Sequence, residues 1–136
     1  MFVRLIVSSA VACGLLAISS AALADTAAAR MFRGKTAQSY PIKVLAKKRK
    51  LKLVHFAADL RCGDGSILTL AEDGFLWTPT GKTGSFRDSQ FGDGDSVYFR
   101  GQMSGKRIRG RVRLINKERG EPRCSSRWIS FNATPH

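Results

Sequence analysis

Side chains that could do acid–base or metal chemistry are few in this sequence. His55 is the one internal histidine, and His136 is the last residue. On an extended strand His55 and Asp59 share a face but lie about 13 Å apart, whereas a general base works within hydrogen-bond reach. No Cys-x-x-Cys or His-x-x-x-His metal spacing occurs. We therefore expect no catalytic residue, no metal and no cofactor.

The carboxylates supply the one enzymatic alternative. Two carboxylates that converge in a cleft can hydrolyse a glycosidic bond, so a carboxylate-based hydrolase stays open. The acids that could take part fall in and around turn-like segments: Asp64, Glu72, Asp73, Asp88, Asp93 and Asp95. Asp-Gly pairs are also ordinary turn formers, and turn formation is the simpler interpretation.

Cationic side chains form two clusters. In the stretch KRIRGRVRLI, arginines occupy every second position, namely Arg107, Arg109, Arg111 and Arg113. The second cluster is AKKRKLKL, which contains Lys47, Lys48, Arg49 and Lys50. Such runs bind polyanions in some proteins and keep turns and sheet edges soluble in others. Both interpretations stay open at this level.

The start of the chain has the layout of a secretory signal peptide. Arg4 is followed by the apolar run LIVSSAVACGLLAI, and Ala22-Leu23-Ala24 is a small-residue cleavage site. Cleavage would leave residues 25–136 as a single domain with no transmembrane segment. That domain carries 22 Lys and Arg against 10 Asp and Glu, a formal charge of +12. We expect a secreted, periplasmic or cell-envelope protein.

Removal of residues 1–24 would also remove Cys13 and leave two cysteines, Cys62 and Cys124. An even pair in an exported domain predicts a disulfide. Two buried thiols are the alternative.

The rest of the chain reads as strands separated by turns. Short runs rich in β-branched and aromatic residues alternate with Gly- and Asp-rich segments, and no amphipathic helix of ten residues is found. We predict strands at 31–35, 42–45, 51–58, 67–71, 75–77, 85–86, 97–102, 107–115 and 128–133. This pattern indicates a single antiparallel β-sandwich or small barrel.

The arginine run belongs to a predicted hairpin. Strands 97–102 and 107–115 flank Ser104-Gly105, and pairing Met103 with Lys106 places Arg100 opposite Arg109. The same register puts Phe99 over Gly110 on the other face. One face of the hairpin is then core, and the other is basic.

Several motifs resemble a family of small exported bacterial β-domains of no established activity. They are the opening Phe32-x-Gly34-x-Thr36-x-Gln38, Cys62-x-Asp64-Gly65, a glycine-punctuated hairpin, and Cys124 ahead of a Trp128 strand. Residues 124–128 depart from the pattern because they contain no glycine. The resemblance implies export, an antiparallel β fold and a disulfide.

These observations predict a non-enzymatic exported β-domain whose basic face contacts an anionic surface or polymer. The contact residues would be Arg100, the four arginines of the run, and the Lys47 to Lys50 cluster. An acidic protein is a further partner class, whereas nothing indicates sequence-specific nucleic-acid binding, because the basic strand is not interleaved with Phe and Tyr. A small-ligand or inhibitor module is the other alternative.

Overall fold

The computed structural model describes residues 28–136; the predicted signal peptide, residues 1–24, lies outside them. Within 28–136 there are ten strands, all paired antiparallel, and no helix. The strands are β1 (Arg30–Thr36), β2 (Pro41–Lys47), β3 (Lys50–Cys62), β4 (Ile67–Asp73), β5 (Trp77–Pro79), β6 (Ser85–Gly92), β7 (Asp95–Ser104), β8 (Arg107–Asn116), β9 (Cys124–Ser125) and β10 (Ile129–Pro135). The predicted all-β class is confirmed.

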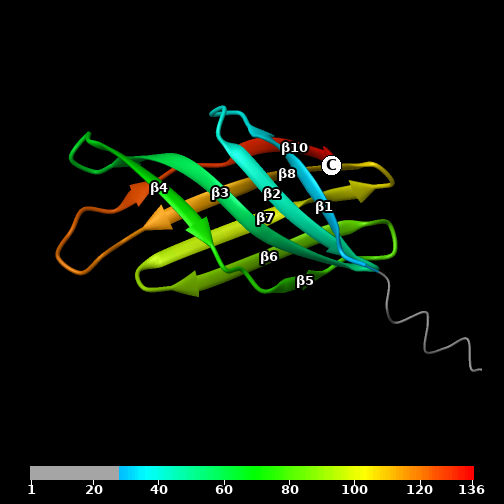
Figure 1. Ribbon diagram of the computed structural model, residues 1–136. Coiled ribbons are helices and arrows are strands. Elements are labelled where there is room, and N and C mark those ends of the chain that lie inside the picture. Colours follow the sequence, from blue (N-terminus) through cyan, green and yellow to red (C-terminus); the bar gives the residue numbers. More distant parts are fainter. Residues whose placement is uncertain (1–27) are drawn as a thin grey trace, which may run out of the picture.

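The strand pairings close into a small barrel. The ring runs from β1 through β2, β3, β9, β8 and β10, and β10 returns to β1. Two strands, β4 and β5, pair with the other edge of β3, and β7 followed by β6 extends from the other edge of β8. Figure 1 shows β6, β7 and β8 lying side by side, with β1, β2 and β3 in the layer opposite.

Alternating burial along the strands builds one hydrophobic core. The burial pattern of β2 switches at every residue, and that of β3 switches along Lys50–Val54, as expected for strands with one face inward. Aromatic side chains fill much of the interior. Phe86 packs on Phe99 at 4.6 Å between ring centroids, and Phe99 stacks on Phe131 at 5.8 Å. The core is therefore shared between β6, β7 and the barrel.

The β7–β8 hairpin forms, but with a different register. The predicted pairing of Met103 with Lys106 is wrong: Ser104 lies opposite Arg107, and Gly105-Lys106 is the two-residue turn. Gly105 has φ 53, which a tight hairpin loop requires of its first residue. The pairing shifts by two residues, so every side chain keeps the face that the sequence predicts.

The shift changes which aromatic rings cover the glycines. Phe99 does not lie opposite Gly110. The cross-strand partner of Gly110 is Gly101. A methyl group on Gly110 would meet the Phe131 ring at 2.8 Å, and one on Gly101 would meet the Phe86 ring at 2.8 Å. Rings from the two flanking strands therefore fill the space that the paired glycines leave.

Three other elements differ from the sequence prediction. The strand expected at 75–77 lies two residues later as β5, and the poorly defined one at 85–86 is the eight-residue β6. β9 is not predicted at all. It lies along the same edge of β8 as β10, and Arg127 between them adopts φ 58. A left-handed non-glycine residue breaks one long strand into two, which residue pattern alone does not show.

The predicted disulfide is confirmed. Cys62 and Cys124 are bonded and lie directly opposite each other on β3 and β9. The cross-link spans a sequence separation of 62 residues. By the chain-entropy model, a loop of that length stabilises the fold by about 4 kcal/mol. Closure of the barrel at β9 therefore depends on a covalent bond as well as on two short ladders.

The motif that opens the domain has structural roles. Phe32 and Thr36 are buried. Gly34 has no room for a side chain, because a methyl group there would overlap the backbone of Asn132 on β10. Gln38 follows β1 in the β1–β2 turn. Its amide donates to the carbonyl of Asp59 at 3.1 Å, and the Asp59 N–H donates to Gln38 Oε1 at 2.8 Å.

Gln38 thus pairs with β3 as a neighbouring strand would, in the gap between β2 and β9.

A second glutamine, Gln90, also pairs with the backbone of another segment through its side-chain amide. The Leu76 N–H donates to Gln90 Oε1 at 2.8 Å, and Gln90 Nε2 donates to the Leu76 carbonyl at 3.2 Å. This second pair crosses the seam, which we define as the gap between β4–β5 and β6–β7. No backbone ladder bridges the seam within 28–136.

Candidate functional site

The outer face of β6, β7 and β8 gathers arginines from three strands. Arg87 lies opposite Arg100, and Arg100 lies opposite Arg111, so that three arginines occupy one row across the sheet. In the next row Arg109 lies opposite Gln102. Directly opposed residues have Cβ atoms about 5 Å apart. The hairpin prediction missed Arg87, because β6 was not recognised as a full strand.

These four arginines surround a shallow depression, which we call the arginine trough. It is lined by Arg87, Arg100, Arg109 and Arg111, by the polar side chains Ser85, Gln102, Ser130 and Asn132, and by Pro79, Phe86, Gly101, Gly110 and Phe131. Phe86 and Phe131 are buried and contribute little side-chain surface to it. The row between the arginines, Phe86, Gly101, Gly110 and Phe131, faces the core, so the middle of the depression has no side chains of its own.

The trough carries unneutralised positive charge. Among the described residues, no carboxylate lies within ion-pair distance of Arg87, Arg109 or Arg111. Unit charges 5 Å apart repel by about 0.8 kcal/mol in water before salt screening. An anion placed between the guanidinium groups would relieve this repulsion and accept their hydrogen bonds. The site is therefore suited to phosphate, sulfate or carboxylate groups.

Arg113, the last arginine of the run, lies apart from the trough. It is half-buried, and Tyr98 lies opposite it on β7. Tyr98 in turn meets the Trp128 ring edge-on at 6.4 Å between centroids. The Nε of Arg113 is buried without a hydrogen-bond partner.

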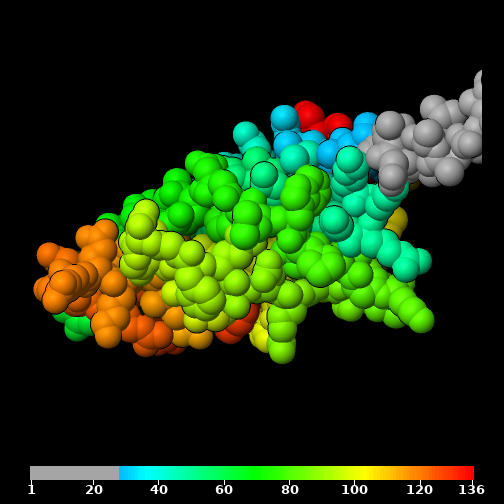
Figure 2. Space-filling model, turned by 90° about the horizontal axis from the view of Figure 1, so that it is seen from below, coloured from blue at the N-terminus to red at the C-terminus, as the bar shows by residue number. Residues whose placement is uncertain are grey.

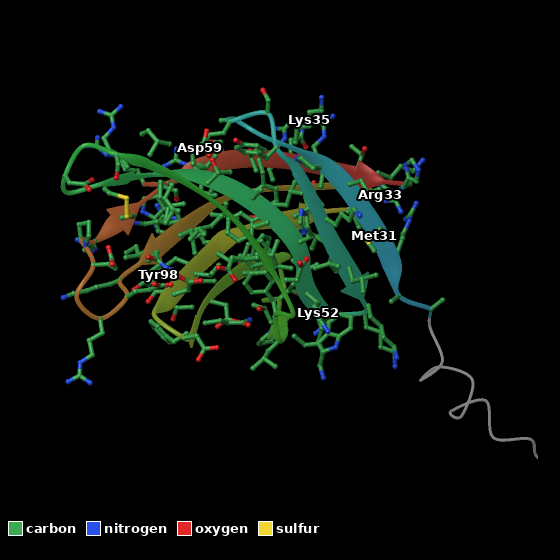
Figure 3. The ribbon with its side chains drawn as sticks, turned by 60° about the vertical axis from the view of Figure 1, so that its left-hand side comes forward. Met31, Arg33, Lys35, Lys52, Asp59 and Tyr98 are labelled. Carbon is green, nitrogen blue, oxygen red and sulfur yellow. A yellow bond between two sulfur atoms is a disulfide. The ribbon has the colours of Figure 1, made fainter. Side chains whose placement is uncertain are left out.

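Further cations extend the basic surface along the same face. Lys106 and Arg107 line a second depression that shares Gln102 and Arg109 with the trough. Beyond β10, Arg33 and Lys35 project outward from β1 (Figure 3), and Lys43 lies opposite Arg33 on β2. These three residues are not among the predicted contact residues, because their proximity to the arginines depends on the β10–β1 pairing.

The second basic cluster occupies the β2–β3 turn. Lys47, Lys48, Arg49 and Lys50 line a depression together with Trp77, Pro79 and Thr80. We call these four cations the lysine turn. Pro79 lines both this depression and the arginine trough, so the two basic clusters are neighbours. Figure 2 shows the lysine turn beside the segment that leads into β6.

Charge is distributed unevenly between the two ends of the barrel. The β2–β3, β5–β6 and β7–β8 turns lie at one end (Figure 1), and none of them contains a carboxylate. The turns at the opposite end contain acids, Asp64, Asp93, Glu118 and Glu121, and the last two share their loop with Lys117, Arg119 and Arg123. Polyanion contact is therefore favoured at the first end and along the adjoining arginine trough.

Two carboxylates do converge, but across the seam. Burial, a hydrogen bond to Asp95 and repulsion from Asp95 and Asp73 raise the pKa of Glu72 to about 7. Asp95 also accepts a hydrogen bond from Asn116 Nδ2 at 2.6 Å. Neither Glu72 nor Asp95 lines any of the five depressions described for residues 28–136. This pair can share a proton between β4 and β7.

His55 has a partner from the next strand. Its Nδ1 lies 2.7 Å from Asp73 Oδ1, and the β3–β4 register places the two residues directly opposite each other. Chain spacing alone points only to neighbours such as Asp59 as partners of His55. Asp59 instead accepts hydrogen bonds from Thr69 Oγ1 at 2.6 Å and Tyr40 OH at 2.8 Å, which lower its pKa. Both carboxylates therefore support the local structure.

Within residues 28–136, no group of three or more His, Cys, Asp or Glu side chains is arranged to hold a metal ion. No helix in this part of the chain has the length and apolar character of a membrane span.

Neither a family model, a curated protein nor a solved structure matches the chain. The resemblance to small exported β-domains therefore stays a prediction, and the function must be argued from the arginine trough and its surroundings.

Proposed function

We propose that this protein is an exported, non-enzymatic β-domain that binds an anionic polymer or surface through its basic face. One observation carries the proposal: Arg87, Arg109 and Arg111 line one open depression and have no carboxylate partners among the described residues. A solubilising surface would work equally well with its arginines dispersed among acids. Concentrated, unpaired guanidinium groups instead suit repeated anionic groups.

The shape of the basic surface favours a polymer over a small anion. The trough is open and continues into the depressions at Arg107 and at the lysine turn. A small anion would be held by enclosing groups, whereas a chain can use a series of shallow contacts. The disulfide suits an oxidising compartment, which agrees with the proposed export. An anionic cell-envelope polymer is the partner we favour, and an acidic protein is the other.

The test measures salt dependence with charge-matched variants. Arg87→Gln, Arg109→Gln and Arg111→Gln are combined in one protein. The control combines Lys117→Gln, Arg119→Gln and Arg123→Gln, which remove the same charge from the loop between β8 and β9. Binding to a soluble polyanion such as polyphosphate is measured by titration at several salt concentrations. Each lost contact lowers the slope of log affinity against log salt by roughly 0.7.

We expect the trough variant to lose about two units of slope and the control to lose almost none, at roughly 0.7 units per contact. Equal losses in both proteins would mean that only net charge matters, and the proposed site would then be wrong. Unchanged binding by the trough variant would equally overturn it. Circular dichroism of both variants establishes that the fold is intact.

A further inference from the structure

The two tryptophans of the chain both lie on the surface, each beside a cluster of cations. Trp128 is 36% exposed and Trp77 is 40% exposed. Indole rings are usually well buried, because they carry a large apolar area. Two exposed rings on a small domain with a packed core therefore call for an explanation, and their neighbours supply one.

Trp128 is held in a fixed position at one end of the arginine trough. The Arg100 guanidinium carbon lies 4.1 Å from the indole centroid, and Tyr98 meets the ring edge-on at 6.4 Å. Trp128 lines a depression with Arg87 and Ser89. Asp88 also lines it, but its carboxylate accepts hydrogen bonds from Thr78 Oγ1 and the Ser89 N–H. The indole is thus a partly exposed apolar surface beside the guanidinium groups of Arg87 and Arg100.

Trp77 lies at the other end of the basic surface. It belongs to β5, where it pairs with Lys52 of β3, and it lines the depression of the lysine turn. Cations therefore line a depression with each of the two tryptophans. Arg87 and Arg100 line the trough and the Trp128 depression, and Pro79 lines the trough and the Trp77 depression. The three depressions form one track from β10 to the β2–β3 turn.

Polar groups without aromatic faces occupy the track between its ends. Ser85, Gln102, Ser130 and Asn132 line the trough, and the two phenylalanines there are 5% exposed and turned into the core. The side chains of Ser130 and Asn132 have no hydrogen-bond partner among residues 28–136. Hydroxyl and amide groups of this kind match the hydroxyls of a sugar. A single-stranded nucleic acid would instead need successive aromatic platforms for its bases.

We propose that the polymer bound in the track is an anionic glycan, with sugar rings packed on Trp128 and Trp77 and its charged groups on the arginines between them. This inference rests on the proposed polyanion binding and specifies its chemistry. Rings contribute the part of the affinity that survives high salt, because apolar stacking is not screened.

The experiment compares three probes of known composition: heparin oligosaccharides as a sulfated glycan, polyphosphate as a polyanion without rings, and oligo(dT) as a nucleic acid. The variants are Trp128→Ala, Trp128→Phe and Trp77→Ala. Ile67→Ala is the control, because Ile67 is 59% exposed and lies outside the track. A Trp77→Phe protein leaves Trp128 as the one indole, so its fluorescence reports on that ring alone.

We expect Trp128→Ala to weaken glycan binding about tenfold, as is typical for loss of a central tryptophan contact. Trp77→Ala should act in the same direction, Trp128→Phe should retain most of the affinity, and Ile67→Ala should change nothing. Polyphosphate binding should stay within about twofold for all four variants, because it needs the arginines alone.

The outcomes separate this inference from the proposed function. If Trp128→Ala weakens polyphosphate as much as the glycan, the ring merely positions Arg100, and the glycan assignment is wrong while polyanion binding stands. If neither tryptophan variant affects the glycan, the assignment is also wrong. Tighter binding of oligo(dT) than of heparin, with quenched Trp128 emission, would assign the track to nucleic acid. Absence of binding to all three probes would overturn both proposals.

Discussion

Replacing Glu72 by glutamine should stabilise the protein at neutral pH. Glu72 lies on β4 and meets Asp95 of β7 across the seam, where Asn116 also contacts Asp95. Burial first, and then hydrogen bonding and repulsion from Asp95, raise the pKa of Glu72 from 4.5 to about 7. The folded state therefore prefers the protonated carboxyl, and ionisation places two like charges at the seam.

The sign of the pH dependence follows from the number of protons bound in each state. Between pH 4.5 and 7 the folded protein keeps a proton on Glu72 that the unfolded chain has lost. The stability that this proton confers is complete below pH 4.5 and is lost as pH rises through 7. The full shift corresponds to about 3 kcal/mol at 1.36 kcal/mol per unit. Solvent screening at a half-buried carboxyl reduces this to about 1–2 kcal/mol.

Urea unfolding at pH 4.5, 6 and 8 measures the effect. Wild-type stability should fall across this range, whereas Glu72→Gln should be flatter and about 1–2 kcal/mol more stable at pH 8. Asp59 and Asp64 have lowered pKa values and act in the opposite sense below about pH 4, in both proteins alike. Asp95→Asn should give a smaller gain, because Glu72 stays buried, and the two gains should not add. A Glu72→Gln protein that parallels wild type at every pH would refute the argument.

Two further changes test the closure of the fold. Gln38→Ala removes two hydrogen bonds to the β3 backbone and should cost about 2 kcal/mol, seen as a lower thermal midpoint. Gln38→Asn, too short to reach, should be equally unstable, and a stable Asn variant would contradict the bridging role. Gly110→Ala should cost roughly 2–3 kcal/mol, because its methyl group meets the Arg100 carbonyl and the Phe131 ring. Gly120→Ala, in open space but with positive φ, should cost less.

Local pattern was enough to predict the class of the fold and the two faces of the hairpin. The alternation of Ile108, Val112 and Leu114 with arginines fixes which side is buried, and this property survives any even shift of register. The register itself depends on the turn. Ser104-Gly105 and Gly105-Lys106 are both plausible two-residue loops, and only packing of distant rings on the paired glycines distinguishes them.

The candidate site was only partly predictable, because non-local pairings assemble it. Arg109 and Arg111 were evident from their spacing. Arg87 joins them through the β6–β7 ladder, which begins in a segment with little strand character in its sequence. Arg113 has the same spacing as the others, yet it is half-buried and does not line the trough. Periodicity shows which face of the sheet a residue occupies, but it does not show which residues from other strands surround it.

The uneven distribution of charge between the two ends of the barrel gives the molecule an electric dipole moment. In the field of a negatively charged surface the domain experiences a torque before it makes any contact, so it arrives with the carboxylate-free turns leading. The disulfide and the turns that carry Asp64 and Asp93 then face away from that surface. Orientation during approach thus precedes binding, and added salt should slow association even where the final complex is unchanged.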